Sequence, residues 1–258
     1  MDYGPYGRVA IVTGSARGIG MGEARVLADR GLYVVIADID AAAAEQTAEE
    51  FRASGARAMS IAVDVSDATS VKQMMDTVYN ELGSLDIVVN NAGIVGRNVT
   101  YDIVDMPEES WDAMIDVHLK GTFLCTKYAA PYMIKQKWGR FINTSSLHAR
   151  TGARHGFSSY GAAKAGITQF TRVAAKELGP KGVTVNSVAP GYVVTTALPI
   201  KNEYLNFIEE QIPLGRFATA EDIGNAVAFL ASNQAEYING TNIEVNGGRV
   251  EFYYKGCP

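Results

Sequence analysis

Apolar, strand-like runs alternate with helical patterns along almost the whole chain. The first run, Arg8–Thr13, is nearly all apolar and β-branched, which is typical of a strand buried on both faces of a sheet. It ends at Gly14, a helix is predicted from Gly18 to Arg30, and the same pattern then repeats. Strands separated by helices imply right-handed crossovers and a parallel sheet that helices cover on both faces. The alternation therefore predicts an α/β protein with a doubly wound parallel sheet in three layers.

The remaining predicted elements continue this order. Strands are expected at residues 32–37, 57–63, 85–90, 139–144, 183–188 and 241–245. Helices are expected at residues 41–54, 67–82, 110–135, 158–178 and 220–232. No linker, repeat or change of composition divides the 258 residues, and α/β folds of this length often form one core. Residues 1–258 are therefore expected to form a single domain.

Charge and composition argue against several functional classes. The chain has 23 Lys and Arg against 28 Asp and Glu, so its net charge of -5 does not favour nucleic-acid binding. Cys125 and Cys257 stand in unrelated contexts, and the histidines form no ligand pattern, so neither a disulfide framework nor a metal site is expected. Residues 1–7 contain no apolar signal segment, and no apolar run approaches membrane-spanning length. We expect a soluble, cytoplasmic protein that does not interact with membranes.

A glycine-rich turn joins the first predicted strand to the first helix. Gly14 permits a tight turn, while Gly18 and Gly20 allow a pyrophosphate to approach the backbone. The spacing is G-x-x-x-G-x-G rather than the commoner G-x-G-x-x-G, and such a turn can also be a turn only. Its position between a buried strand and a helix favours phosphate binding. The cofactor-binding candidates in this turn are Gly14, Ser15, Arg17, Gly18, Ile19 and Gly20.

Asp38 follows the second predicted strand, where Rossmann folds have an acid that accepts hydrogen bonds from ribose hydroxyl groups. Its charge would repel a 2′-phosphate, which favours NAD over NADP. Arg17 argues weakly for NADP, since a guanidinium can pair with that phosphate. The alternative role for Asp38 is to cap the following helix. We expect NAD, because a desolvated carboxylate beside a phosphate dianion costs more than an exposed arginine gains.

Tyr160 and Lys164 are four residues apart in a predicted helix, so they share one face. A free tyrosine has a pKa of about 10, and a neighbouring ammonium lowers it by stabilising the phenolate. Tyr160 would then exchange a proton with a carbonyl or alcohol oxygen near neutral pH. The same spacing also arises by chance on solvated helices, so the pair acquires weight only from the rest of the chain.

Several motifs together resemble the short-chain dehydrogenase/reductase family. They occur in the family's order and loops and cover essentially the whole chain. These motifs are Thr13-Gly-x-x-x-Gly-x-Gly20, Asp64, Asn90-Asn-Ala-Gly93, Ser146, Tyr160-x-x-x-Lys164, Pro190-Gly191, Pro213-Leu-Gly-Arg216 and Asn246-Gly-Gly248. Each is weak alone, but in register they are specific. The resemblance implies an NAD(P)-dependent oxidoreductase that acts on CH–OH groups by direct hydride transfer, without a metal.

The resemblance also implies individual roles. Ser146, with Ser145 as the alternative, would donate a hydrogen bond to the substrate oxygen, and Tyr160 would be the general acid/base. Lys164 would lower the pKa of Tyr160 and hold the nicotinamide ribose. The Val193 backbone and Thr195 would hold the nicotinamide carboxamide. The strand-end candidates for the adenosine half are Asp64, Val65, Asn91, Ala92 and Gly93, although the asparagine amides can also tie strand ends together.

His118 stands where the family usually has a catalytic asparagine. A histidine keeps the backbone carbonyl at this position, and its ring can still form hydrogen bonds. Our hypothesis is that His118 preserves the family's proton relay. The alternative is a histidine that only fills space near a helix kink.

Residues 195–213 are irregular and then amphipathic, and they match the family's substrate lid. Apolar candidates for the pocket wall are Phe157, Tyr192, Leu198, Tyr204, Phe207 and Ile208, so a secondary alcohol or ketone with apolar surface is the expected small-molecule substrate. Alternatives are a 3-oxoacyl-thioester reductase, a polyol dehydrogenase, a hydroxysteroid dehydrogenase or a non-catalytic dinucleotide-binding protein. Asp38 and the acidic balance argue against the thioester reductase, for which NADPH and a basic docking patch are expected.

The family resemblance also implies assembly. The last predicted helix and strand lie where family members form homotetramers, with a dimer as the alternative. The aromatic tail, residues 251–258, is expected to pack on a neighbouring subunit.

Overall fold

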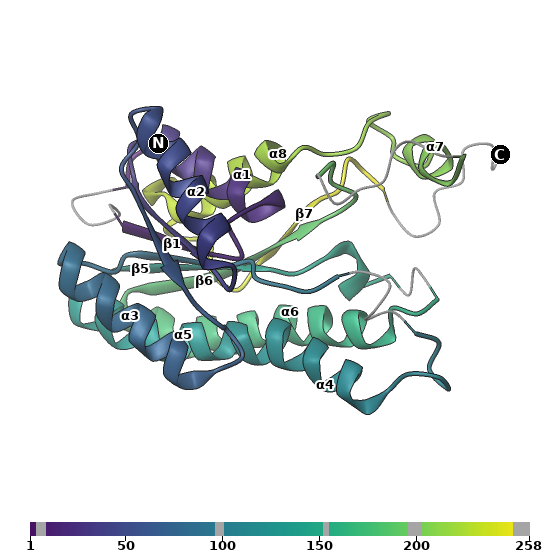
Figure 1. Ribbon diagram of the computed structural model, residues 1–258, viewed down its shortest axis with the longest axis horizontal. Helices are drawn as coiled ribbons and strands as arrows, with labels where there is room; N and C mark the ends of the chain where they lie inside the picture. Colours follow the sequence, from purple (N-terminus) through teal and green to yellow (C-terminus); the bar gives the residue numbers. More distant parts are fainter. Residues whose placement is uncertain (4–8, 96–100, 152–154, 196–202, 250–258) are drawn as a thin grey trace.

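A computed structural model of the chain describes residues 1–3, 9–95, 101–151, 155–195 and 203–249. The described residues form one parallel sheet in the strand order β3-β2-β1-β4-β5-β6-β7 (Figure 1). Its strands are β1 (Val9–Thr13), β2 (Tyr33–Asp38), β3 (Ala58–Ala62), β4 (Ile87–Asn90), β5 (Gly139–Thr144), β6 (Val183–Pro190) and β7 (Asn242–Val245). The predicted doubly wound parallel fold is confirmed.

Helices cover both faces of the sheet (Figure 1). One layer contains α1 (Gly18–Asp29), α2 (Ala41–Ala53) and α8 (Ala220–Ala231). The opposite layer contains α3 (Ala68–Leu82), α5 (Gly121–Gln136) and α6 (Ser158–Leu178), with α4 (Glu108–Ile115) alongside. A further helix, α7 (Glu203–Glu210), lies in the predicted lid region, away from these layers (Figure 1). None of the described helices is both long and apolar enough to cross a bilayer.

The sheet is buried on both faces, which explains why its strands read as nearly continuous apolar runs. In β1, Ala10 and Val12 belong to the core under α1 and α8, whereas Val9 and Ile11 belong to the core under α3 and α5. Helix α1 also packs closely on α8, because a Cβ atom on Gly22 would lie only 2.3 Å from Ala220 Cβ. This contact requires glycine at position 22.

The chain order changes direction between β1 and β4, which pair with each other in the middle of the sheet. In such folds ligands bind beyond the carboxyl ends of the strands, at this switch point. All strands are parallel, so the loops after β1, β2, β4, β5 and β6 lie at that one edge. The topology thereby gathers motifs that are far apart in sequence.

The predicted helix at residues 110–135 is in fact three segments. Helix α4 ends at Ile115, a π-helical turn spans Asp116–Lys120, and α5 begins at Gly121. The wider turn contains His118, whose backbone oxygen accepts a hydrogen bond from the Thr122 hydroxyl at 2.7 Å. Its ring contacts the loop after β4. A regular apolar pattern does not reveal such a bulge, because it depends on contacts with another part of the chain.

Candidate active site

The glycine-rich turn lies against the loop after β4. Gly14 has a φ angle of 65°, and a Cβ atom there would lie 2.7 Å from Ala92 Cα. A Cβ atom on Gly20 would lie 2.4 Å from the Gly14 oxygen. Both positions therefore exclude a side chain. The Asn91 amide donates to the Thr13 and Gly14 backbone oxygens at 3.0 and 3.1 Å, so it ties β4 to this turn.

The N-terminus of α1 differs from those of three other helices. Asp40, Asp67 and Thr219 cap α2, α3 and α8 with their side chains. Helix α1 has no side-chain cap at Arg17 and no acid in its first turn. Uncapped amide groups and the helix dipole favour an anion, so this N-terminus fits the pyrophosphate of a dinucleotide.

Not every residue of the turn faces this site. The Ser15 hydroxyl donates to the Val12 oxygen at 2.6 Å and accepts from the Ala37 amide at 3.1 Å, which ties β1 to β2. Ile19 packs against the core under α1. Gly18 borders open space, since the nearest atom to a Cβ there would be Thr195 Cγ2 at 3.9 Å. The predicted carboxamide-binding Thr195 thus lies across the turn from Gly18.

Asp38 lies beside the glycine-rich turn and does not cap α2. Its Oδ2 atom accepts from the Ala16 amide at 3.0 Å, and its Oδ1 atom accepts from the Asp40 amide at 3.1 Å. The cap of α2 is Asp40, which accepts from the Ala43 amide at 3.1 Å. Arg17 forms an ion pair with Asp40. The Ala43 amide, and to a lesser extent Arg17, lower the pKa of Asp40. Two carboxylates therefore flank the end of β2, and the candidate phosphate-binding arginine is already paired.

The other strand-end candidates mainly hold loops together. Asp64 accepts from the Ser66 amide at 2.9 Å and from the Ser66 hydroxyl. Val65 is buried against Gly121, and the Ala92 amide donates to the Thr13 hydroxyl at 3.1 Å. These contacts shape the edge of the sheet where the carboxyl ends of the strands meet. Val193 is buried and pairs with Ala218 through a backbone bridge.

Ser146, Tyr160 and Lys164 gather beyond the end of β5. Ser146 and Tyr160 are hydrogen-bonded through their side chains. The Ser145 hydroxyl instead bonds to two groups of α6. It donates to the Lys164 backbone oxygen at 3.2 Å and lies 2.7 Å from the Thr168 hydroxyl. The Lys164 Nζ atom donates to the Thr144 oxygen at 2.6 Å and lies 5.6 Å from the centre of the Tyr160 ring. The geometry thus favours Ser146 over Ser145 as the partner of Tyr160.

Burial dominates the electrostatics of this cluster. It raises the pKa of Tyr160, and the hydrogen bond from Ser146 only partly opposes this effect. Burial also lowers the pKa of Lys164 to about 7. The expected lowering of the pKa of Tyr160 by Lys164 is therefore outweighed in this structure. The reason is that the lysine nitrogen is directed to the Thr144 carbonyl, and the phenol is largely desolvated although Tyr160 is still partly exposed.

His118 is 2% exposed and lies between the loop after β4 and Tyr160. Its Nε2 atom is 3.0 Å from both the nitrogen and the oxygen of Ile94. Its ring meets the Tyr160 ring at 87°, with centroids 5.4 Å apart. A Cβ atom on Gly93 would lie 2.3 Å from the His118 ring. Burial lowers the pKa of His118 to about 3, so the ring is neutral at physiological pH and holds the Ile94 backbone next to Tyr160.

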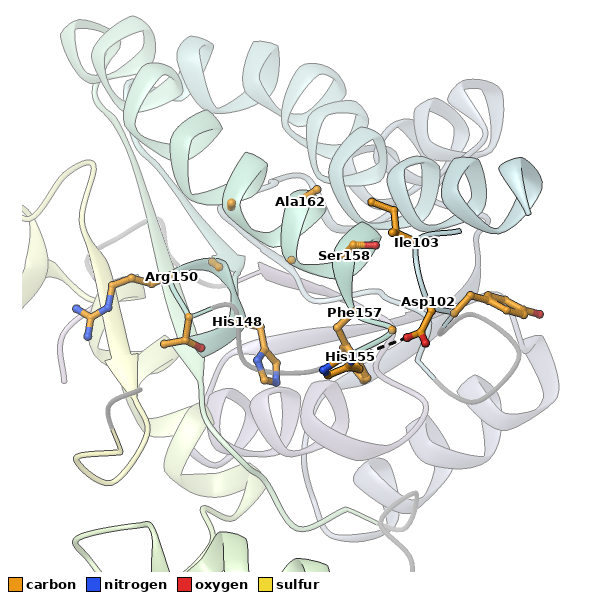
Figure 2. Close-up of a pocket in the computed structure, with 14 residues that line it drawn as sticks. Asp102, Ile103, His148, Arg150, His155, Phe157, Ser158 and Ala162 are labelled. Carbon is orange, nitrogen blue, oxygen red and sulfur yellow. Dashed lines mark ion pairs between the residues drawn. The ribbon is translucent and has the colours of Figure 1, made fainter. Parts of the chain in front are cut away.

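A cavity of about 680 Å³ lies between the start of α6, the loop after β5 and residues 101–103 (Figure 2). Figure 2 shows His148 and Phe157 beside each other on its wall, and both rings lie about 6 Å from the ring of Tyr160. Arg150 reaches away from them toward Glu244, with which it forms an ion pair of 3.2 Å. The cavity is a candidate substrate pocket.

His148 lies two residues after Ser146 in the chain, and this position is a sequence signal for contact with the substrate. Its ring also lies 6.4 Å from Tyr192. Tyr192 packs in an apolar cluster with Leu205, Ile208, Ile212 and Phe217, which anchors α7. Phe207 is half exposed, and the side chains of Leu198 and Tyr204 lie outside the described residues.

Comparison with known proteins gives consistent results. Residues 14–249 match the protein family described as enoyl-(acyl carrier protein) reductase. The chain is 43% identical over 241 residues to the 3-oxoacyl-[acyl-carrier-protein] reductase FabG of Staphylococcus aureus, covering 93% of this chain and 96% of the relative. It is 40% identical over 244 residues to the FabG of Aquifex aeolicus, covering 94% and 97%.

Solved structures agree in fold. One, assigned as a short-chain alcohol dehydrogenase from Sinorhizobium meliloti, has a TM-score of 0.89 at 33% identity and covers 96% of this chain and 98% of its own. Another, assigned as a gluconate dehydrogenase from Agrobacterium tumefaciens, has a TM-score of 0.90 at 32% identity with the same coverage.

Proposed function

Since the chain belongs to the short-chain dehydrogenase/reductase family of oxidoreductases, we propose that it interconverts a ketone and a secondary alcohol by direct hydride transfer with NAD. The main support is the cluster of Ser146, Tyr160 and Lys164 beyond β5. It lies at the edge of the sheet where the carboxyl ends of the strands meet. A non-catalytic dinucleotide-binding protein would not require these three side chains together.

The chain's own groups fit a dinucleotide. The uncapped N-terminus of α1 would hold the pyrophosphate, and Asp38 would accept hydrogen bonds from the adenosine ribose. Lys164 would hold the nicotinamide ribose, while Val193 and Thr195 would hold the carboxamide. When bound, NAD supplies the hydride acceptor. The roles of Lys164, Val193 and Thr195 follow from the family resemblance, and all of these groups lie toward the edge of the sheet where the carboxyl ends of the strands meet.

Tyr160 carries the proton in this mechanism. During oxidation the alcohol O–H proton passes to the Tyr160 phenolate while the carbinol C–H bond breaks and the hydride leaves, which forms the carbonyl. During reduction Tyr160 returns a proton to the substrate oxygen. Ser146 donates a hydrogen bond to that oxygen, and His118 keeps the Ile94 backbone beside the phenol.

NAD is the proposed cofactor because of charges at the end of β2. Asp38 and Asp40 are both acidic, and Arg17, whose guanidinium argued for NADP, is paired with Asp40. A 2′-phosphate would meet two carboxylates and compete for that arginine. Ribose hydroxyl groups would instead donate to Asp38.

For the substrate, the relatives favour the thioester alternative over the broader prediction of an apolar secondary alcohol. Relatives 40–43% identical over nearly their whole length are 3-oxoacyl-[acyl-carrier-protein] reductases. A 3-oxoacyl thioester is itself a ketone that is reduced to a secondary alcohol, so the chemistry at Tyr160 is the same. We therefore propose a 3-oxoacyl thioester as the substrate.

The test is a matrix of cofactors and substrates. Purified protein is mixed with NAD, NADH, NADP or NADPH and with one substrate from a panel of 3-oxoacyl thioesters, cyclic and aryl alcohols, sterols and polyols. Turnover is followed by the absorbance of the reduced cofactor. We expect reduction of the 3-oxoacyl thioester with NADH, and loss of that activity in Tyr160→Phe. A better substrate elsewhere in the panel overturns the thioester assignment only. Turnover that persists in Tyr160→Phe overturns the mechanism.

Three further expectations belong to this proposal. Residues 1–258 form one domain with a lid at residues 195–213, the protein is cytoplasmic, and it assembles as a homotetramer. Light scattering that reports a monomer contradicts the last. The aromatic tail proposed to contact a neighbour lies outside the described residues.

A further inference from the structure

Glu23 is a buried carboxylic acid that the mechanism above does not use. It lies on the stripe of α1 that faces the sheet, one turn after Gly20 and one turn before Leu27, and it is 0% exposed. Neither of its carboxyl oxygens has a hydrogen-bond partner among the described residues. Burying such a group costs stability, and an apolar side chain would pack there without this cost. Its presence therefore calls for a reason other than folding.

Thr144 connects this position to the catalytic cluster. Alternate strand residues face the same side of a sheet, so the Thr144 side chain faces the side of Ile142, which packs in one core with Ala24 and Leu27 of α1. The Thr144 hydroxyl is also buried without a partner among the described residues. The Thr144 carbonyl accepts from Lys164 Nζ at 2.6 Å. Glu23 thus belongs to the helix on the face that the Thr144 side chain faces, whereas Lys164 bonds to the end of β5 from α6 on the opposite face.

The charged groups around this pair are few. Helix α8 packs on α1 through Ala220 and Gly224, and β1 presents Ala10 and Val12 to the same core. On the other face, Lys164 is accompanied by Tyr160 and by the neutral ring of His118. Glu23 and Lys164 influence each other electrostatically across the strand end, and neither is shifted by another charge from the described residues.

We propose that Glu23 is a positioning residue that controls the charge of Lys164 and, through it, the proton affinity of Tyr160. This inference rests on the proposed roles of Lys164 and Tyr160. An ionised Glu23 favours the lysine ammonium, and the ammonium favours the tyrosinate that takes the alcohol proton. Burial raises the pKa of Glu23 to about 8 and lowers the pKa of Lys164 to about 7, so both groups titrate in the working pH range.

The first test is the pH dependence of alcohol oxidation in Glu23→Gln. Without the carboxylate, Lys164 is less readily protonated and tyrosinate is less stabilised. The midpoint of the kcat/KM profile should therefore move to higher pH by about 0.5–1 unit, a loss of about 3–10-fold below the midpoint. Asp29→Asn is the matched control, since it removes an exposed carboxylate from the same helix and should leave the profile unchanged. A Glu23→Gln profile that matches the control overturns the proposal.

Glu23→Met serves as a second variant if the glutamine variant folds poorly, because an apolar side chain of similar length suits the core around it. It should shift the profile in the same direction while thermal stability is kept or raised. A purely structural role for Glu23 would change stability without moving the profile.

A direct readout separates this inference from the proposed function. The infrared band of the protonated Glu23 carboxyl is isolated as the difference between wild type and Glu23→Gln and is titrated with pH. In a Lys164→Met background the midpoint should rise, because the ammonium that favours the carboxylate is gone. An unchanged midpoint overturns the coupling, whether or not the protein turns over any substrate tested.

Discussion

Replacing Asp38 with asparagine should weaken the discrimination between NAD and NADP. The Asp38 carboxylate accepts from the Ala16 amide at 3.0 Å, within the turn that would hold the cofactor phosphates. A 2′-phosphate on a ribose bound at Asp38 would meet this charge, and two unit charges about 5 Å apart interact by about 3 kcal/mol at an effective dielectric constant of about 20. Asp38 is only partly buried, so screening should leave about 1–2 kcal/mol.

This free energy corresponds to a change of about 5–30-fold in the ratio of kcat/KM for NAD to that for NADP. The ratio is measured with one substrate in wild type and in Asp38→Asn, with circular dichroism and thermal melting to confirm folding. Asp40→Asn is the informative companion, because it releases Arg17 and should raise the use of NADP by a separate route. If Asp38→Asn leaves the ratio within about twofold of wild type, less than 0.5 kcal/mol of discrimination acts through this carboxylate, and the electrostatic argument for NAD is wrong.

Other substitutions test the remaining assignments. Ser146→Ala should lower kcat by about 100-fold, because a donor to the reacting oxygen is lost. Ser145→Ala should lower kcat by less than about tenfold, because the Ser145 hydroxyl bonds to α6 instead. His118→Asn should retain most activity, since an amide can still bond the Ile94 backbone, and His118→Ala should lose about tenfold or more; equal kcat values in the two variants would refute a positioning role. The free energy of unfolding should depend on pH differently in wild type and Glu23→Met. The folded-state pKa of Glu23, about 8, exceeds the ordinary value of 4.5 for a glutamic acid, so the native state holds a proton that the unfolded state releases. Wild type should therefore lose stability relative to Glu23→Met as pH rises from about 5 to 7, by about 1 kcal/mol per unit, in urea unfolding followed by circular dichroism. Parallel stability curves for the two proteins would contradict this linkage.

The sequence predicted the sheet well because its strands are buried on both faces. In β1 and β2 almost every side chain enters one of two cores, so the apolar run itself marks the strand. The bounds of β5 and α6 are the predicted ones. The π-helical turn at Asp116–Lys120 was missed, since the apolar pattern of residues 110–135 gives no sign of it; the structure shows that its His118 ring bonds to Ile94 after β4. Glu23 was missed as well, although a carboxylic acid on the buried stripe of a predicted helix was a visible signal.

The sequence by itself determined the order of strands and helices, the glycine-rich turn and the family, because these depend on local pattern and on motifs in a fixed register. Tertiary structure alone decided which partners these side chains have. It bonds the Ser145 hydroxyl to Lys164 and Thr168 of α6, gives the cap of α2 to Asp40 rather than Asp38, and makes the His118 ring neutral. The physical reason is that hydrogen-bond partners and desolvation are set by neighbours far away in the chain, such as Ile94 for His118. A sequence pattern shows which side chain is present, whereas the fold determines what surrounds it.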